Sequence, residues 1–244
     1  NRRFISRIAR WHFAPTALAR SNLMAESIPS DRIHVTGNTG IDTLLWMKNR
    51  VISKDFSSVY GSANDILHSG LPIVLITGHR RECFGEDLEG LCRAIAHMAR
   101  KHADWQFIYP VHLNPNVHAP VHQYLSNIYN VHLIAPLEYA PFVQLMNRAK
   151  FIITDSGGIQ EEAPSLGKPV IVTRSVTERP EGLEAGSSVL VGSDFEQLVI
   201  ESESLMQDDA RYAKMVSIKN PYGDGQAVQR IIGVLEDNLL NKGP

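Results

Sequence analysis

Short apolar runs alternate with helix-length amphipathic segments from about residue 71 onward, and this alternation constrains the fold more than any other feature of the sequence. The apolar runs predict strands at Ile73–Thr77, Gln106–Val111, Val131–Ile134, Phe151–Thr154, Pro169–Thr173 and Ser188–Val191. The segments between them predict helices at Asp87–His102, Pro120–Ile128, Tyr139–Lys150 and Ile159–Leu166. Apolar strands joined by helices form a parallel sheet that is covered on both faces. The sequence therefore predicts an α/β fold with an open, doubly wound sheet of six strands, for which the usual strand order is 3-2-1-4-5-6.

The two ends of the chain do not continue this alternation. Within residues 1–50 the sequence predicts helices at Ala17–Glu26 and Thr43–Asn49 and a strand at Ile33–Thr36, with Thr16 capping the first helix. Residues 51–65 are polar and contain Gly and Ser, so we expect a linker or a short helix there. In residues 217–244, the turn "NPYGDG" precedes a predicted helix at Gln226–Leu240. The main domain is therefore expected at residues 66–216, because residues 1–50 are too few for a core of their own.

The composition argues against several classes of partner and chemistry. The formal net charge of -2, from 24 Lys and Arg against 26 Asp and Glu, does not favour nucleic acid as a partner. No apolar run reaches the ~18 residues of a membrane span. Two cysteines, Cys83 and Cys92, make no disulfide framework, so we expect a reducing compartment, the cytoplasm. Neither GxxxxGKS/T nor GxGxxG occurs, so ATP hydrolysis and dinucleotide redox chemistry lack support.

Polar residues follow four of the predicted strands. The first strand is followed by "GHRRECFG", the second by "HLNPN", the fourth by "DSGG" and the fifth by "RSVTERPEG". Because the carboxyl ends of parallel strands lie at one edge of the sheet, we expect these residues to converge there. In open α/β sheets, ligands bind at that edge, at the switch point between strands 1 and 4.

The "DSGG" turn and the acids after it predict a nucleotide site. Gly157 and Gly158 let the backbone approach a ligand closely, and Ser156 is expected to cap a helix whose N-terminus suits a phosphate. Glu161 and Glu162 are adjacent and so point about 100° apart on a helix. One of them can therefore accept hydrogen bonds from sugar hydroxyls while the other faces elsewhere. The alternative is plain helix capping, with acids that complement the helix dipole.

Four histidines, His79, His112, His118 and His122, are candidates for a metal site or for a binding cleft. His112, His118 and His122 suggest a metal, but Pro115 and the Ala119–Pro120 pair are expected to break the helical spacing, so no metal site is predicted. His112 follows a strand and is interpreted as a cleft residue, with His118 and His122 on the surface. His79 follows the first strand beside two arginines, which favours a functional role over a buried structural histidine.

Taken together, the motifs resemble a known family. "VTGNTGIDTLLW", "TGHRRE", "YPVHLNPNV", "ITDSGGIQEEAPSLGKPV", "TERPEG" and "NPYGDG" occur in the order of the bacterial, non-hydrolysing UDP-N-acetylglucosamine 2-epimerases. The resemblance covers essentially the whole chain. It implies a GT-B fold of two Rossmann-like domains and the interconversion of UDP-GlcNAc and UDP-ManNAc for polysaccharide biosynthesis. It also implies a homodimer that needs neither a redox cofactor nor a metal.

The resemblance assigns roles residue by residue. It implies that His79 lies in the catalytic cleft against the diphosphate and that Arg179 pairs with the diphosphate. The backbone of Ser156, Gly157 and Gly158 is expected to hold the phosphates, and Glu162 the ribose hydroxyls. Leu137 and Phe142 are expected to flank the uracil. Arg80 and His112 match positions linked in this family to a second, regulatory UDP-GlcNAc.

The chain departs from the family at its start. Family members carry an N-terminal Rossmann-like domain with the acids that move the C2 proton, and residues 1–50 match only its last unit. Residues 217–244 are expected to pack back on that domain. The implied reaction is elimination of UDP to give 2-acetamidoglucal, followed by re-addition of UDP with the opposite stereochemistry at C2. Three alternatives remain open: a hydrolysing epimerase, a GT-B glycosyltransferase and a non-catalytic UDP-sugar binding module.

Overall fold

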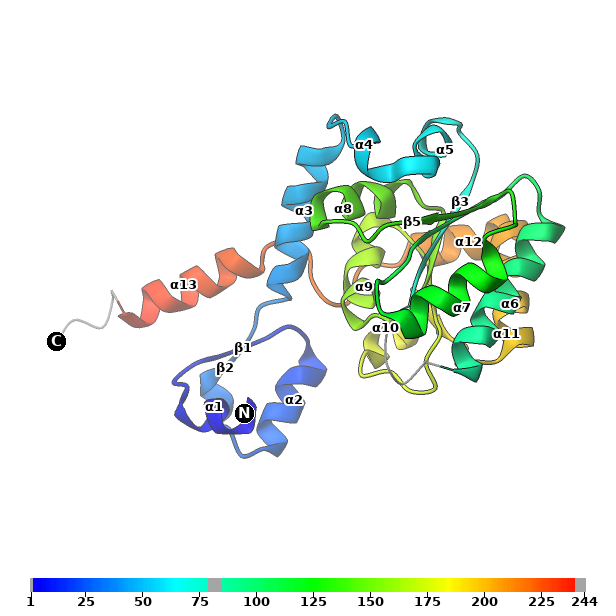
Figure 1. Ribbon diagram of the computed structural model, residues 1–244. Coiled ribbons are helices and arrows are strands. Elements are labelled where there is room, and N and C mark those ends of the chain that lie inside the picture. The colour runs from blue at the N-terminus through cyan, green and yellow to red at the C-terminus, as the bar shows by residue number, and fades with distance from the viewer. Residues whose placement is uncertain (1, 79–84, 240–244) are drawn as a thin grey trace. The chain divides into compact units, whose positions relative to one another are not determined.

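The computed structural model describes residues 2–78 and 85–239 of the chain. The chain folds into two compact units (Figure 1). The smaller unit is formed by Asn1–Trp46 together with Asn220–Pro244, and the larger unit by Met47–Lys219. Among the described residues, we find no helix with the length and apolar character needed to span a membrane.

The larger unit contains the predicted six-stranded parallel sheet. Its strands are β3 (Ile73–Thr77), β4 (Gln106–Pro110), β5 (Val131–Ile134), β6 (Phe151–Thr154), β7 (Val170–Val172) and β8 (Ser188–Leu190). Their order in the sheet is β5-β4-β3-β6-β7-β8, and every neighbouring pair is parallel. The prediction of an α/β fold with strand order 3-2-1-4-5-6 is therefore confirmed. β3 and β6 are neighbours, so the switch point lies between them.

Helices cover both faces of this sheet, as Figure 1 shows. They are α6 (Glu86–Lys101), α7 (Pro115–Leu125), α8 (Tyr139–Arg148), α9 (Gly157–Glu162), α10 (Pro180–Ala185), α11 (Phe195–Gln207) and α12 (Asp209–Val216), with a 3-10 turn, η4 (Ala163–Leu166), after α9. Leu88, Cys92 and Ile95 of α6 recur at helical spacing and are buried in the main core with residues of α7 and α11. α8 contacts β3 and η4 and contributes none of its residues to that core.

Helix α7 corrects the prediction for the histidine segment. The helix begins at Pro115, not at Pro120, and Pro120 lies inside it. Pro115 occupies the first turn, where its missing N–H leaves no bond unmade, and Asn114 caps the helix by accepting the Asn116 N–H at 3.0 Å. The expectation that the prolines break the helical spacing was therefore wrong. His118 and His122 lie one turn apart, and their rings stack with centroids 4.1 Å apart.

The segment expected as a linker or a short helix, residues 51–65, holds packed helical turns. These are α4 (Ser57–Tyr60), η2 (Gly61–Ala63) and the start of α5 (Asn64–His68). Tyr60 is 1% exposed, and its hydroxyl donates to the Pro141 carbonyl at 2.9 Å. The Gln144 amide donates to the carbonyls of Val51 and Lys54, at 2.7 and 2.9 Å. These bonds fasten the segment to α8, and the larger unit accordingly begins at Met47.

The smaller unit has a two-stranded parallel sheet of β1 (His12–Ala14) and β2 (Ile33–Val35). Its helices are α1 (Arg2–Ile8), α2 (Ala17–Ala25) and α13 (Ala227–Leu239), together with the 3-10 turn η1 (Ser30–Arg32) and the start of α3 (Thr39–Val51). Thr16 caps α2, as predicted, by accepting the Ala19 N–H at 3.1 Å. Asp42 of α3 accepts the first two N–H groups of α13, at 3.1 and 2.9 Å. The last helix is thereby bonded to a helix that starts near residue 40.

Candidate functional site

The carboxyl ends of β3, β4 and β5 open onto a cavity of about 260 Å³. The cavity is lined by Thr77, Gly78, Pro110, His112, Pro136, Leu137, Phe142 and Ile159. Most of these side chains are apolar. The structure thus brings together three residues singled out from the sequence, His112, Leu137 and Phe142. His112 is exposed, and its Nδ1 accepts the Asn114 N–H at 3.1 Å.

Hydrogen bonds inside the sheet fix the loops that border this cavity. The hydroxyls of Thr77 on β3 and Thr154 on β6 lie 2.6 Å apart, and Thr154 also accepts the Ser156 N–H at 3.0 Å. The Tyr109 hydroxyl donates to the Gly78 carbonyl at 3.1 Å. A Cβ atom at Gly78 would lie only 3.1 Å from the same hydroxyl, so a larger residue here would have to displace the Tyr109 side chain.

Helix α9 begins at Gly157, directly after Ser156. Ser156 occupies the N-cap position with extended backbone, but its side chain makes no capping hydrogen bond, so the expected side-chain cap is wrong. Gly157 is buried and Gly158 is exposed. A Cβ atom at Gly157 would lie 3.4 Å from Cζ and Nη2 of Arg179, so the guanidinium lies directly against the start of α9.

The two adjacent glutamates of α9 face different partners, as their spacing predicts. Glu161 Oε1 accepts the Arg179 Nε–H at 2.5 Å, whereas Glu162 Oε1 accepts the Tyr139 hydroxyl at 3.2 Å. Burial raises the pKa of Glu162 to about 7, the Tyr139 hydrogen bond opposes this shift, and the charge of Glu161 adds to it. Burial, followed by the charge of Glu162, raises the pKa of Tyr139 above its usual value. The Tyr139 hydrogen bond thus offsets only part of the cost of holding a negative charge on Glu162.

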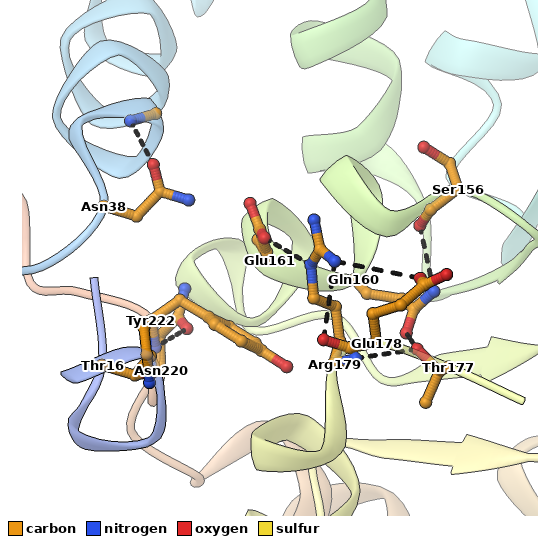
Figure 2. A network of polar contacts seen from close by, with 12 residues as sticks. Thr16, Asn38, Ser156, Gln160, Glu161, Thr177, Glu178, Arg179, Asn220 and Tyr222 are labelled. Carbon is orange, nitrogen blue, oxygen red and sulfur yellow. Dashed lines mark hydrogen bonds and ion pairs between the residues drawn. The ribbon is translucent and has the colours of Figure 1, made fainter. Parts of the chain in front are cut away.

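A chain of hydrogen bonds links α9 to the loop after β7 (Figure 2). The Thr177 hydroxyl donates to Gln160 Oε1 at 2.7 Å and accepts the Arg179 N–H at 3.1 Å. The Gln160 amide nitrogen donates to the Ser156 carbonyl at 3.3 Å. Sequence reasoning gave no role to Gln160, Thr177 or Tyr139. Their only signal was their place inside "SGGIQEE", "TERPEG" and the segment before Phe142.

Two of the residues named from the sequence, His79 and Arg80, lie outside the described residues. In residues 2–78 and 85–239, no three side chains of the His, Cys, Asp and Glu types gather as a metal ion would require. The described part of the site therefore consists of an apolar cavity, a half-buried carboxyl group and an arginine beside a glycine-rich helix start.

One family of known proteins matches nearly the whole chain. The sequence model of the family UDP-N-acetylglucosamine 2-epimerase matches residues 1–236. The chain is 49% identical, over 242 residues, to the UDP-N-acetylglucosamine 2-epimerase of Escherichia coli K12, covering 99% of this chain and 64% of that protein. The chain thus spans a little under two thirds of the length of the curated relatives it matches.

Solved structures agree in fold over nearly the whole chain. The UDP-GlcNAc 2-epimerase from Neisseria meningitidis, crystallised with UDP-GlcNAc, superposes with a TM-score of 0.90 at 45% identity, covering 98% of this chain and 64% of that one. The S. aureus MnaA–UDP co-structure gives a TM-score of 0.89 at 37% identity, covering 100% of this chain and 65% of that one.

Proposed function

Because this chain belongs to the UDP-N-acetylglucosamine 2-epimerase family, we propose that the whole protein interconverts UDP-GlcNAc and UDP-ManNAc and that this chain supplies its UDP-binding part. Its fold class is the α/β, GT-B type of that family. The observation that carries the proposal is the convergence, at one edge of the sheet, of an apolar cavity, the Glu162 carboxyl group and the Arg179 guanidinium. A uracil, a ribose and a diphosphate need these three environments.

In this proposal the uracil lies in the cavity, flanked by Leu137 and Phe142. Glu162 accepts hydrogen bonds from the ribose hydroxyls, because it lies on the same helix as Ile159, which lines the cavity, and its half-buried carboxyl group has a raised pKa. His112 and Arg80 keep their implied role, contact with a second, regulatory UDP-GlcNAc. Because His112 lines the same cavity as Phe142, that second molecule would lie next to the uracil.

The diphosphate is proposed to lie over the start of α9, on the backbone of Ser156, Gly157 and Gly158. Arg179 and His79 are proposed to stabilise the charge that UDP acquires as the anomeric C–O bond breaks. Loss of UDP leaves 2-acetamidoglucal, and UDP then re-adds with the opposite configuration at C2. The C2 proton must be removed and returned, which requires carboxylates.

We propose that these carboxylates come from the part of the family's length that this chain does not span. Within the chain, Glu161 is bonded to Arg179 and Glu162 to Tyr139. We further propose that the smaller unit is the end of an N-terminal Rossmann-like domain, with the last helix packed on it. The bonds from α13 to Asp42 support this. The homodimer and the cytoplasmic location stay predictions.

Titration with UDP tests the nucleotide site. We expect the 244-residue chain to bind UDP and Phe142→Ala to bind it at least about fivefold more weakly, because base–aromatic stacking contributes ~1–3 kcal/mol. Phe4→Ala is the matched control, since Phe4 is 73% exposed in the smaller unit. If Phe142→Ala binds UDP as tightly as the parent, the uracil assignment is wrong.

Proton exchange tests the division of labour. UDP-GlcNAc incubated with this chain in deuterated water should gain no deuterium at C2, whereas a protein spanning the family's full length should introduce it. Deuterium at C2 with this chain alone would show that the catalytic acids lie within it. Transfer of the sugar to an acceptor would instead identify a glycosyltransferase.

A further inference from the structure

The Thr177 hydroxyl links helix α9 to the loop after β7, beside the proposed diphosphate site. Thr177, in the loop after β7, donates to Gln160 of α9 and accepts the backbone N–H of Arg179, at 2.7 and 3.1 Å. Gln160 is 1% exposed, and its amide nitrogen returns to the Ser156 carbonyl at the start of the same helix. The path from Ser156 to the Arg179 backbone is therefore continuous (Figure 2). Movement of the Arg179 backbone relative to α9 requires breaking one of these bonds.

The Arg179 side chain is also held in one direction. Its Nε–H donates to Glu161 at 2.5 Å, and its Nη2 lies where a Cβ atom on Gly157 would be only 3.4 Å away. The side chains of Arg179 and Glu161 are 33% and 20% exposed. A partly exposed ion pair contributes little to stability, so stability alone gives a weak reason for this arrangement. Orientation gives a better reason, because a guanidinium bound through Nε presents its Nη edge in a fixed plane.

We propose that Gln160, Glu161 and Thr177 are positioning residues, which hold the Arg179 guanidinium against Gly157 so that it meets the diphosphate of the nucleotide sugar. This inference rests on the proposed function. A free arginine side chain loses rotamer entropy when a ligand orders it. Where the protein has already ordered the arginine side chain, ligand binding does not have to offset this loss of entropy. The guanidinium N–H groups then point at the diphosphate before the anomeric C–O bond breaks.

Replacing Thr177 tests the inference, because its hydroxyl makes two of the bonds. Thr177→Val keeps the shape of the side chain and removes the hydroxyl, whereas Thr177→Ser keeps the hydroxyl. We expect Thr177→Val to weaken UDP binding about tenfold and UMP binding less than about twofold, since UMP lacks the second phosphate. Thr177→Ser should bind UDP within about twofold of the parent.

Two further variants separate positioning from general loosening of the loop. In an Arg179→Gln background, Thr177→Val should cause no additional loss of UDP affinity, because the group that it positions is gone. Thr43→Val is the matched control, since the Thr43 hydroxyl bonds to the Thr39 carbonyl within α3 at 3.2 Å. It should leave both affinities unchanged.

The outcomes of these experiments test the positioning role separately from the proposed UDP-binding function. If Thr177→Val weakens UDP and UMP equally, or adds its full effect to Arg179→Gln, the hydroxyl stabilises the loop and positions nothing. The inference is then overturned while the nucleotide site stands. If the parent chain binds no UDP, the proposed function fails and the inference falls with it.

Discussion

Replacing Glu162 by Gln should stabilise the protein at pH 8 and reduce its affinity for UDP. Glu162 is a carboxyl group that burial holds at a pKa of about 7, against 4.5 for the free side chain. The folded protein therefore binds this proton more tightly than the unfolded chain does. As the pH rises from 4.5 towards 7, the unfolded chain gives up the proton first, and the stability of the fold decreases.

The size of this effect follows from the shift. Two and a half units at 1.36 kcal/mol each give about 3 kcal/mol as an upper limit at pH 8. Solvent at this partly exposed site lowers the expected value to roughly 1–2 kcal/mol. A glutamine does not ionise, so Glu162→Gln removes this cost, and its carbonyl can still accept the Tyr139 hydroxyl. At pH 5 the folded parent already holds the proton, and most of the difference should disappear.

Urea unfolding, followed by circular dichroism at pH 5 and pH 8, measures both values. Glu184→Gln is the matched control, because Glu184 is exposed on α10, and its effect should not change between the two pH values. The reasoning is refuted if Glu162→Gln differs from the parent by the same free energy of unfolding at both pH values. If Glu162→Gln gains stability and loses affinity for UDP, Glu162 lowers the stability of the fold but contributes to nucleotide binding.

Two further substitutions test the fold itself. Asn130→Asp should lower the free energy of unfolding by about 3 kcal/mol, because the buried Asn130 amide donates to the carbonyls of Ala99 and Trp105, at 2.9 and 2.8 Å, and a carboxylate cannot. Urea unfolding beside the exposed control Asn127→Asp measures this, and a loss below about 1 kcal/mol would contradict it. Gly225→Ala should lower the melting temperature, because φ is +81° and the new Cβ would lie 2.6 Å from Leu45. Gly233→Ala, inside α13 with no atom within 4 Å, should not lower it.

The sheet could be predicted from the sequence because its strands are apolar throughout. All four residues of β6 are buried, as are all five of β3, and such runs between amphipathic helices admit few other structures. The helical packing of residues 51–65 was harder to predict, because that segment is polar. Its buried anchor, Tyr60, is a single residue whose partners lie about eighty residues further along the chain.

Helix α7 shows a different limit. Prolines were weighed as helix breakers, but the cost of a proline depends on its place in the helix. Pro115 lies in the first turn, where its N–H would have no partner in any case, and Asn114 supplies a cap one residue earlier. Proline does disrupt a helix interior, but to apply this rule one must know where the helix starts. The sequence pattern placed that start at Pro120, five residues after the true start at Pro115.

The sequence by itself determined the six-stranded parallel sheet and the edge at which the polar motifs converge. These follow from hydrophobic periodicity and from the single edge that parallel strands share, while the strand order is the usual one of doubly wound sheets. The motifs of that edge also indicated the family. Only the tertiary structure decided which side chains come together: Phe142 and His112 line one cavity, Glu161 bonds to Arg179, and Gln160 bonds to Thr177. The two bonded pairs join helix α9 to the loop after β7 at hydrogen-bond distance, and no local pattern records so short a distance between separate segments.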